Sequence, residues 1–278
     1  MVVEYHSGFK TMGPRTAQLV TELNQRNQSA FTLADVEAIT GLRSVSARSL
    51  IQKAQKRCLV TRLKPGLFNL VPFELGRATE YVGNPYLIAQ KIAAGAEYFI
   101  SHGSAFELHR MVTQPQLVIT ASCVRRIRPQ TVGGYAYRFF QVPDSAMFGI
   151  SKYWVTKENC VFVSDPERSI IDGLQKPDLV GGITEVAKAL WMAREHMKVD
   201  RLVEYALRIN IGAVIRRLGY LLEAYGLADD GALDPLRARL TAGYQRLDPL
   251  FPAEGHKLAR WRLQINIAPE ELDAVRHG

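Results

Sequence analysis

The stretch FTLADVEAITGLRSVSARSLIQKAQKRCLVTRLKPGLFNLV, residues 31–71, decides the fold of the N-terminal part of the chain. Thr32 and Asp35 have the spacing of a capping box, which predicts a short helix that ends at Gly41. After Ser44, apolar residues recur at i, i+3, i+4, i+7 and i+11, which predicts a second helix with one apolar face. Two short helices joined by a tight glycine-containing turn are typical of a helix-turn-helix.

A β-hairpin is predicted directly after the second helix. Leu59–Leu63 and Leu67–Val71 are strand-like, and the Pro65-Gly66 pair between them is a turn signature. A hairpin in this position is a wing, so residues 1–82 are predicted to form a winged helix-turn-helix DNA-binding domain. The alternative is a winged-helix module that binds protein.

The second helix is the predicted DNA-reading element, because the corresponding helix of the motif lies in the major groove. Arg and Lys favour guanine there, Gln favours adenine, and Ser can meet either base or phosphate. The exposed N–H groups at Ser44–Ala47 would also suit a phosphate. The predicted DNA-contacting residues are Arg43, Ser44, Ser46, Arg48, Ser49, Gln52, Lys53 and Lys56 of the helix, with Arg62 and Lys64 of the wing.

Length and charge agree with two domains and an anionic partner. The chain has 278 residues, of which 47% are apolar and 22% charged, and this composition excludes disordered and fibrous classes. The net charge of +8 lies in the first half, since residues 1–82 hold 11 basic and 6 acidic side chains. Gly41–Phe73 contains no acid at all, which suits a surface for a polyanion, and an ordinary solvated basic face is the equal alternative.

A second acid-free basic run, Leu108–Pro143, is a second candidate nucleic-acid surface through Arg125, Arg126, Arg128 and Arg138. The aromatic residues Tyr135, Tyr137, Phe139 and Phe140 interleave with Arg138. They could stack on RNA bases, but core positions on a strand are the favoured interpretation.

Residues 83–278 are predicted to form a mixed α/β domain with a helical C-terminal half, after a linker at 74–83. The class is therefore α+β, with no repeats. A helix is predicted to begin at Asn84-Pro85, and another at Asp165-Pro166, where aspartate caps and proline occupies the first turn. Strands are predicted at 98–100, 116–121, 135–142, 160–163 and 259–267, and residues 183–226 are predicted to be mainly helical.

No catalytic residue, cofactor or metal site is predicted, and the chain is not expected to be an enzyme. Met111–Pro143 has no acid, which argues against the paired aspartates of a nucleotidyltransferase. No P-loop, Rossmann fingerprint or nucleophile elbow is present. His102 and His109 are interpreted as structural. The alternative is a winged-helix-guided, metal-dependent nuclease or a phosphate-handling enzyme that uses Asp165, Glu167 and Asp172.

The expected location is the cytoplasm, with no membrane contact. The three cysteines are far apart and form no C-x-x-C, which argues against a disulfide framework and a cysteine zinc site. No apolar run approaches the length of a membrane span, and Met1–Lys10 has no signal-peptide core.

Four motifs resemble the AbiEi-type antitoxins and transcriptional regulators of bacterial abortive-infection (type IV toxin–antitoxin) systems. They are KPGLF (64–68), NPYLIA (84–89), SHGSAFELH (101–109) and DPERSIID (165–172). The resemblance runs from about residue 14 to about residue 267. One departure lies at the wing, where the family often has Arg-Gly and this chain has Pro65-Gly66. Wing contacts then fall to Lys64 and Arg62.

The resemblance implies two functions. The winged helix would bind inverted repeats in double-stranded DNA upstream of its own operon and repress it. The C-terminal domain would act in phage defence as the antitoxin that counteracts a nucleotidyltransferase toxin, without a stable complex between the two proteins.

Overall fold

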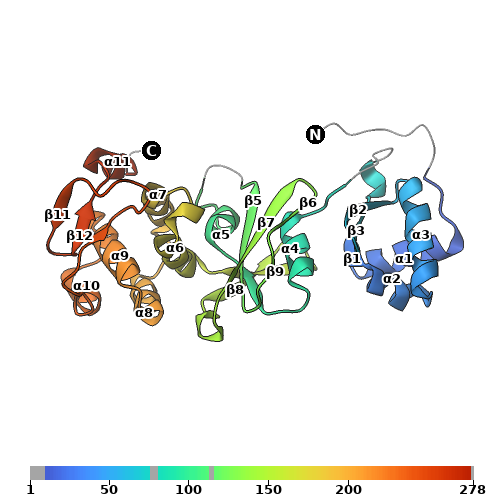
Figure 1. Cartoon of the computed structure of the whole chain (residues 1–278), viewed down its shortest axis with the longest axis horizontal. Helices are drawn as coiled ribbons and strands as arrows, with labels where there is room; N and C mark the ends of the chain where they lie inside the picture. Colours follow the sequence, from blue (N-terminus) through green and yellow to red (C-terminus); the bar gives the residue numbers. More distant parts are fainter. Residues whose placement is uncertain (1–9, 76–80, 113–115, 277–278) are drawn as a thin grey trace. The chain divides into compact units, whose positions relative to one another are not determined.

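The computed structural model describes residues 10–75, 81–112 and 116–276, and this part of the chain is mixed α+β (Figure 1). It contains eleven α-helices and three β-sheets. Contacts within the chain define two compact units, and each is treated by itself below. The first comprises 1–96 with 129–137 and 153–161, and the second comprises 97–128, 138–152 and 162–278. The domain boundary after residue 82 stays a prediction, because residues 76–80 of the expected linker lie outside the described residues.

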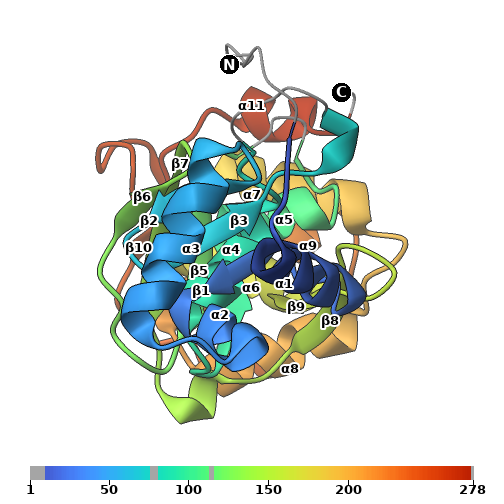
Figure 2. The same cartoon turned by 90° about the vertical axis from the view of Figure 1, so that its right-hand side faces the viewer.

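The first unit contains a helical cluster on a small sheet. Figure 2 shows α1, α2 and α3 lying over one face of the three strands. The sheet has the order β1-β3-β2 and is antiparallel, with Phe31 opposite Phe68 and Thr61 opposite Asn69. The elements are α1 (Pro14–Gln25), β1 (Ala30–Thr32), α2 (Leu33–Thr40), α3 (Ser44–Lys56), β2 (Val60–Lys64), β3 (Leu67–Leu70) and α4 (Pro85–Ala93).

Local sequence chemistry accounts for the start and end of α2. Thr32 Oγ1 accepts a hydrogen bond from the Asp35 N–H, and Asp35 Oδ2 accepts one from the Thr32 N–H at 2.6 Å, which confirms the predicted capping box. Gly41 ends the helix at φ +68°, a left-handed conformation that glycine adopts without steric cost. The strand β1 was not predicted, because three residues are too few to show an alternating pattern.

The second unit is built on the central strands of a six-stranded sheet of order β6-β7-β5-β4-β9-β8. β4 is antiparallel to β5, with Ile100 opposite Ala121, and parallel to β9, with Ile100 opposite Val163. The strands of this sheet are β4 (Tyr98–Ile100), β5 (Val118–Cys123), β6 (Gln130–Val132), β7 (Tyr135–Gln141), β8 (Ile150–Trp154) and β9 (Cys160–Ser164). Of these, β6 belongs to the first unit.

Helices follow the sheet strands and enclose the largest apolar core. α5 (His102–Leu108) packs on β5 and on α6 (Pro166–Gln175), and α6 packs on the three helices after it. Asp165 caps α6 and Pro166 opens it, as predicted. The remaining helices are α7 (Ile183–Ala193), α8 (Val199–Ile209), α9 (Gly212–Ala224), α10 (Asp230–Arg237) and α11 (Pro269–Ala274).

The prediction of a late strand over 259–267 is wrong for the first half of that range. Only Leu263–Ile265 form a strand, β12, which lies between β10 (Gln245–Arg246) and β11 (His256–Leu258). Trp261 precedes the strand and is completely buried in the core of this unit. Trp261 is buried although it lies in a turn, so this segment shows the alternation of apolar and polar residues that is typical of a strand. None of the described helices is long and apolar enough to cross a membrane.

Candidate nucleic-acid interface and a second cavity

α3 is held in the first unit by one face only. Ala47, Ile51 and Ala54 are buried in the core with Leu19 and Phe31. The helix therefore presents its other face outward. All eight residues predicted to contact DNA from this segment are exposed, namely Arg43, Ser44, Ser46, Arg48, Ser49, Gln52, Lys53 and Lys56.

The β2–β3 hairpin lies beside α3 and brings one more predicted residue to the same region. A hollow of about 360 Å³ is lined by Arg48 and Gln52 of α3 and by Arg62 of β2. Gln55 also lines it, a residue that sequence reasoning missed although it is seven positions after Arg48 and so shares its helix face. Arg62 is exposed, and it places a cation opposite those of α3.

Lys64, the other predicted wing residue, is engaged within the unit. Its Nζ donates a hydrogen bond to Gln130 Oε1 at 2.6 Å, and the side chain is only half-exposed. Desolvation lowers the pKa of Lys64. Of the two predicted wing cations, Arg62 is therefore the more exposed.

The beginning of α3 differs from the expected phosphate site. The Ser44 hydroxyl donates to the Glu37 carboxylate, which comes from α2. A carboxylate at this position opposes an anion at the first turn of α3. Sequence spacing did not reveal the contact, because Glu37 and Ser44 belong to different helices.

The second basic run is exposed, but most of its aromatic partners are not. Arg125, Arg126, Arg128 and Arg138 are all exposed. Tyr137 and Phe139 are buried, which confirms the interpretation of these two as core residues. Phe140 is half-buried, with its ring 5.1 Å from that of His102 and 5.5 Å from the Arg138 guanidinium.

Each of the three carboxylates of the alternative enzyme hypothesis has partners within the chain, and Asp165 and Glu167 share one, Arg201, at 4.0 and 3.7 Å. Asp165 Oδ1 caps α6 through the Arg168 N–H, and its Oδ2 accepts from the Tyr205 hydroxyl. Glu167 Oε1 accepts from the Lys198 N–H at 2.9 Å, and Asp172 pairs with Arg168. In the described part of the chain no three His, Cys, Asp or Glu side chains gather in a way that could hold a metal ion.

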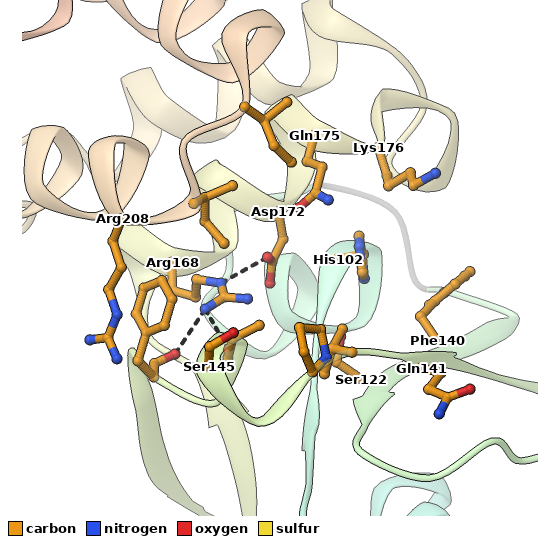
Figure 3. Close-up of a pocket in the computed structure, with 16 residues that line it drawn as sticks. His102, Ser122, Phe140, Gln141, Ser145, Arg168, Asp172, Gln175, Lys176 and Arg208 are labelled. Carbon is orange, nitrogen blue, oxygen red and sulfur yellow. Dashed lines mark hydrogen bonds and ion pairs between the residues drawn. The ribbon is translucent and has the colours of Figure 1, made fainter. Parts of the chain in front are cut away.

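A cavity of about 620 Å³ lies in the second unit beside α6 (Figure 3). His102, Arg168 and Asp172 line its inner part, and Lys176 and Arg208 lie at its exposed rim. His109 lies elsewhere and bonds through Nε2 to the Ser164 carbonyl at 2.6 Å, in agreement with the structural role predicted for it. Sequence reasoning missed the cavity, because its wall comes from five separate segments.

Comparison with known proteins finds a likeness of fold and none of sequence family. No protein-family model and no curated protein matches it. Its fold is that of a solved α+β protein of the same extent. That protein is RV2827C from Mycobacterium tuberculosis, with a TM-score of 0.68 and 16% identity over 100% of both chains. At this identity the likeness shows a shared fold alone.

Proposed function

We propose that the chain is a DNA-binding transcriptional autorepressor that also acts as the antitoxin of a type IV toxin–antitoxin system. Its N-terminal part would be a winged helix-turn-helix, with α3 as the recognition helix and β2–β3 as the wing. The observation that carries the proposal is the outward face of α3, whose polar residues are cationic or hydrogen-bonding, with exposed Arg62 beside it. Such a face suits phosphates and base edges in the major groove.

The target proposed for this face is an inverted repeat upstream of the chain's own operon. A gel-shift titration with that DNA and with a scrambled duplex tests sequence-specific binding. Retardation that survives the scrambled competitor would support the autorepressor. A reporter driven by the same upstream region would then be repressed by the full chain.

The antitoxin part rests on the resemblance of residues 84–89, 101–109 and 165–172 to AbiEi-type proteins. Its proposed partner is a nucleotidyltransferase toxin, opposed without a stable complex, and this role requires no catalytic group in the present chain. Co-expression tests it: the full chain should relieve growth arrest by the neighbouring toxin gene. Persistent arrest with soluble antitoxin present would contradict this part alone.

Arg62→Ala should weaken binding to operator and scrambled duplexes alike. A phosphate contact carries no sequence information, so its loss should also lower the salt dependence of binding by about one unit of slope. Lys64→Ala should have a smaller effect, because the Lys64 ammonium is already bonded to Gln130. Fluorescence anisotropy at several salt concentrations measures both slopes. A loss confined to the operator would assign Arg62 to base recognition instead.

Val45 should read a thymine methyl group. It is the second residue of α3, between Ser44 and Ser46, and its side chain is 79% exposed. Apolar side chains at this end of a recognition helix contact the thymine C5-methyl. Replacing the contacted thymine by uracil removes one methyl, worth about 0.8 kcal/mol or roughly fourfold in affinity.

Each operator thymine is replaced by uracil in turn, and the binding of these duplexes is also measured with the matched variant Val45→Ser. This variant should bind thymine and uracil duplexes equally, whereas the wild type should prefer thymine at one position of each half-site. Equal binding of all duplexes by the wild type would remove Val45 from base recognition and leave the other contacts of α3 untouched.

A further inference from the structure

The cavity beside α6 has polar groups that nothing in the DNA-binding proposal uses. The Asp172 carboxylate is buried at 3% exposure, and its Oδ1 accepts from Arg168 Nε at 2.8 Å. Its Oδ2 is also buried and has no hydrogen-bond partner within the described residues. A buried carboxylate oxygen without a donor is unfavourable. The cavity that Asp172 lines is where such a donor could enter.

His102 is held beside this cavity in a strained conformation. Its φ of +54° is uncommon for a residue with a side chain, and such strain collects at functional sites. Ser122 donates to Ser101 Oγ at 3.0 Å, and Ser101 Oγ lies 2.8 Å from His102 Nδ1. Nδ1 of His102 is therefore hydrogen-bonded to a hydroxyl within the chain.

The inner part of the cavity carries no net charge. Arg168 and Asp172 form a buried ion pair. Burial lowers the pKa of His102, against the opposing effect of Asp172, and this favours the neutral imidazole. Inserting a cation here would bring it against the Arg168 guanidinium. A neutral N–H donor fits the free Asp172 oxygen better.

The rim, in contrast, is cationic. Lys176 and Arg208 are both exposed, and neither has an ion-pair partner within the described residues. The Arg208 guanidinium lies 3.9 Å from the centre of the Phe148 ring, and the Arg168 guanidinium lies 4.3 Å from the same centre. Stacking on Phe148 holds Arg208 at the rim, where it can meet an anion.

We propose that this cavity is a binding site for a small organic anion whose far end donates a neutral N–H to Asp172 Oδ2. The anionic end would lie at the rim with Arg208, and the half-buried Phe140 offers apolar surface to a planar ring. The same chemistry is found in heterocyclic carboxylates and in nucleoside monophosphates. The site is independent of the proposed DNA-binding function.

Isothermal titration of the full chain with two matched pairs of probes tests the site. Orotate has ring N–H groups and a carboxylate, whereas benzoate has the carboxylate alone. Guanosine monophosphate has ring N–H groups and a phosphate, whereas ribose 5-phosphate has the phosphate alone. We expect the N–H-bearing member of at least one pair to bind roughly tenfold or more tighter than its partner. The pair that responds identifies the anion.

Three variants decide whether binding occurs in this cavity. Asp172→Asn keeps an oxygen for Arg168 but replaces the free acceptor by a donor, so it should abolish the preference within the pair. Arg208→Gln should weaken the binding of the anionic probes roughly tenfold, while the preference for the N–H-bearing member of the pair remains. Arg239→Gln, another exposed arginine, does not line the cavity and should change nothing.

Two results would overturn the proposal. One is that none of the four probes binds the wild-type chain at millimolar concentration, although the chain still unfolds in a cooperative thermal transition. The other is binding that is unchanged in both Asp172→Asn and Arg208→Gln. Since Arg208 is exposed, its variant should fold normally, and unchanged binding in Arg208→Gln alone overturns the proposal if Asp172→Asn is unstable.

Discussion

Arg48→Ala is expected to lower the affinity for the operator by about 1–3 kcal/mol, or roughly 5- to 150-fold. Arg48 is exposed on the outward face of α3 and lines the hollow shared with Arg62 and Gln52. A guanidinium in that position can donate two hydrogen bonds to guanine O6 and N7, and alanine can donate none. Anisotropy titrations with operator and scrambled duplexes measure the loss.

Whether the loss of affinity depends on the DNA sequence distinguishes base recognition from general attraction to the charged backbone. Affinity for the scrambled duplex should fall much less, since that DNA is bound through phosphates. Arg26→Ala is the matched control, because Arg26 is also an exposed arginine of the first unit but pairs with Glu22 on α1. Equal losses in Arg48→Ala and Arg26→Ala would contradict a recognition role for α3.

Arg168→Met is expected to lower the free energy of unfolding of the second unit by about 3–5 kcal/mol, because it leaves the buried Asp172 carboxylate without its counter-ion. Arg168 Nη1 also donates to the carbonyls of Ala146 and Phe148, which would lose that donor. Urea unfolding followed by tryptophan fluorescence reports mainly this unit, since Trp261 is buried in its core and Trp191 packs against it, whereas Trp154 of the first unit is exposed.

A double variant separates the charge from the packing. Arg168→Met with Asp172→Leu removes both ions, and it should recover much of the lost stability because a buried pair is often replaceable by apolar side chains. The two carbonyls would still lack a donor, so recovery should be incomplete. A double variant less stable than Arg168→Met would show that Asp172 stabilises the unit without its arginine.

Local chemistry was predictable because the deciding atoms are near one another in the sequence. Thr32 and Asp35 form the capping box three residues apart, and Asp165 with Pro166 starts α6 within one turn. The exposed face of α3 followed from helical periodicity in the same way. In each case the competing conformations are few and the hydrogen-bond partner is specified by spacing.

The parts that were not predictable depend on distant partners. Lys64 meets Gln130 across 66 residues, and the contact makes it a poorer phosphate ligand than its place at the wing suggests. The cavity beside α6 combines α5, β5, β7, α6 and α8, and within it Arg168 donates to one oxygen of Asp172 while the other has no donor within the described residues. Periodicity and spacing carry no information about such assemblies.

The most direct measurement is a titration of the full chain against its own upstream DNA at two salt concentrations, with a scrambled duplex as competitor. Tight binding to the operator that survives the competitor, weakens with salt and falls in Arg48→Ala but not in Arg26→Ala is the expected result. No binding at either salt, or equal binding to both duplexes, would contradict a sequence-specific repressor.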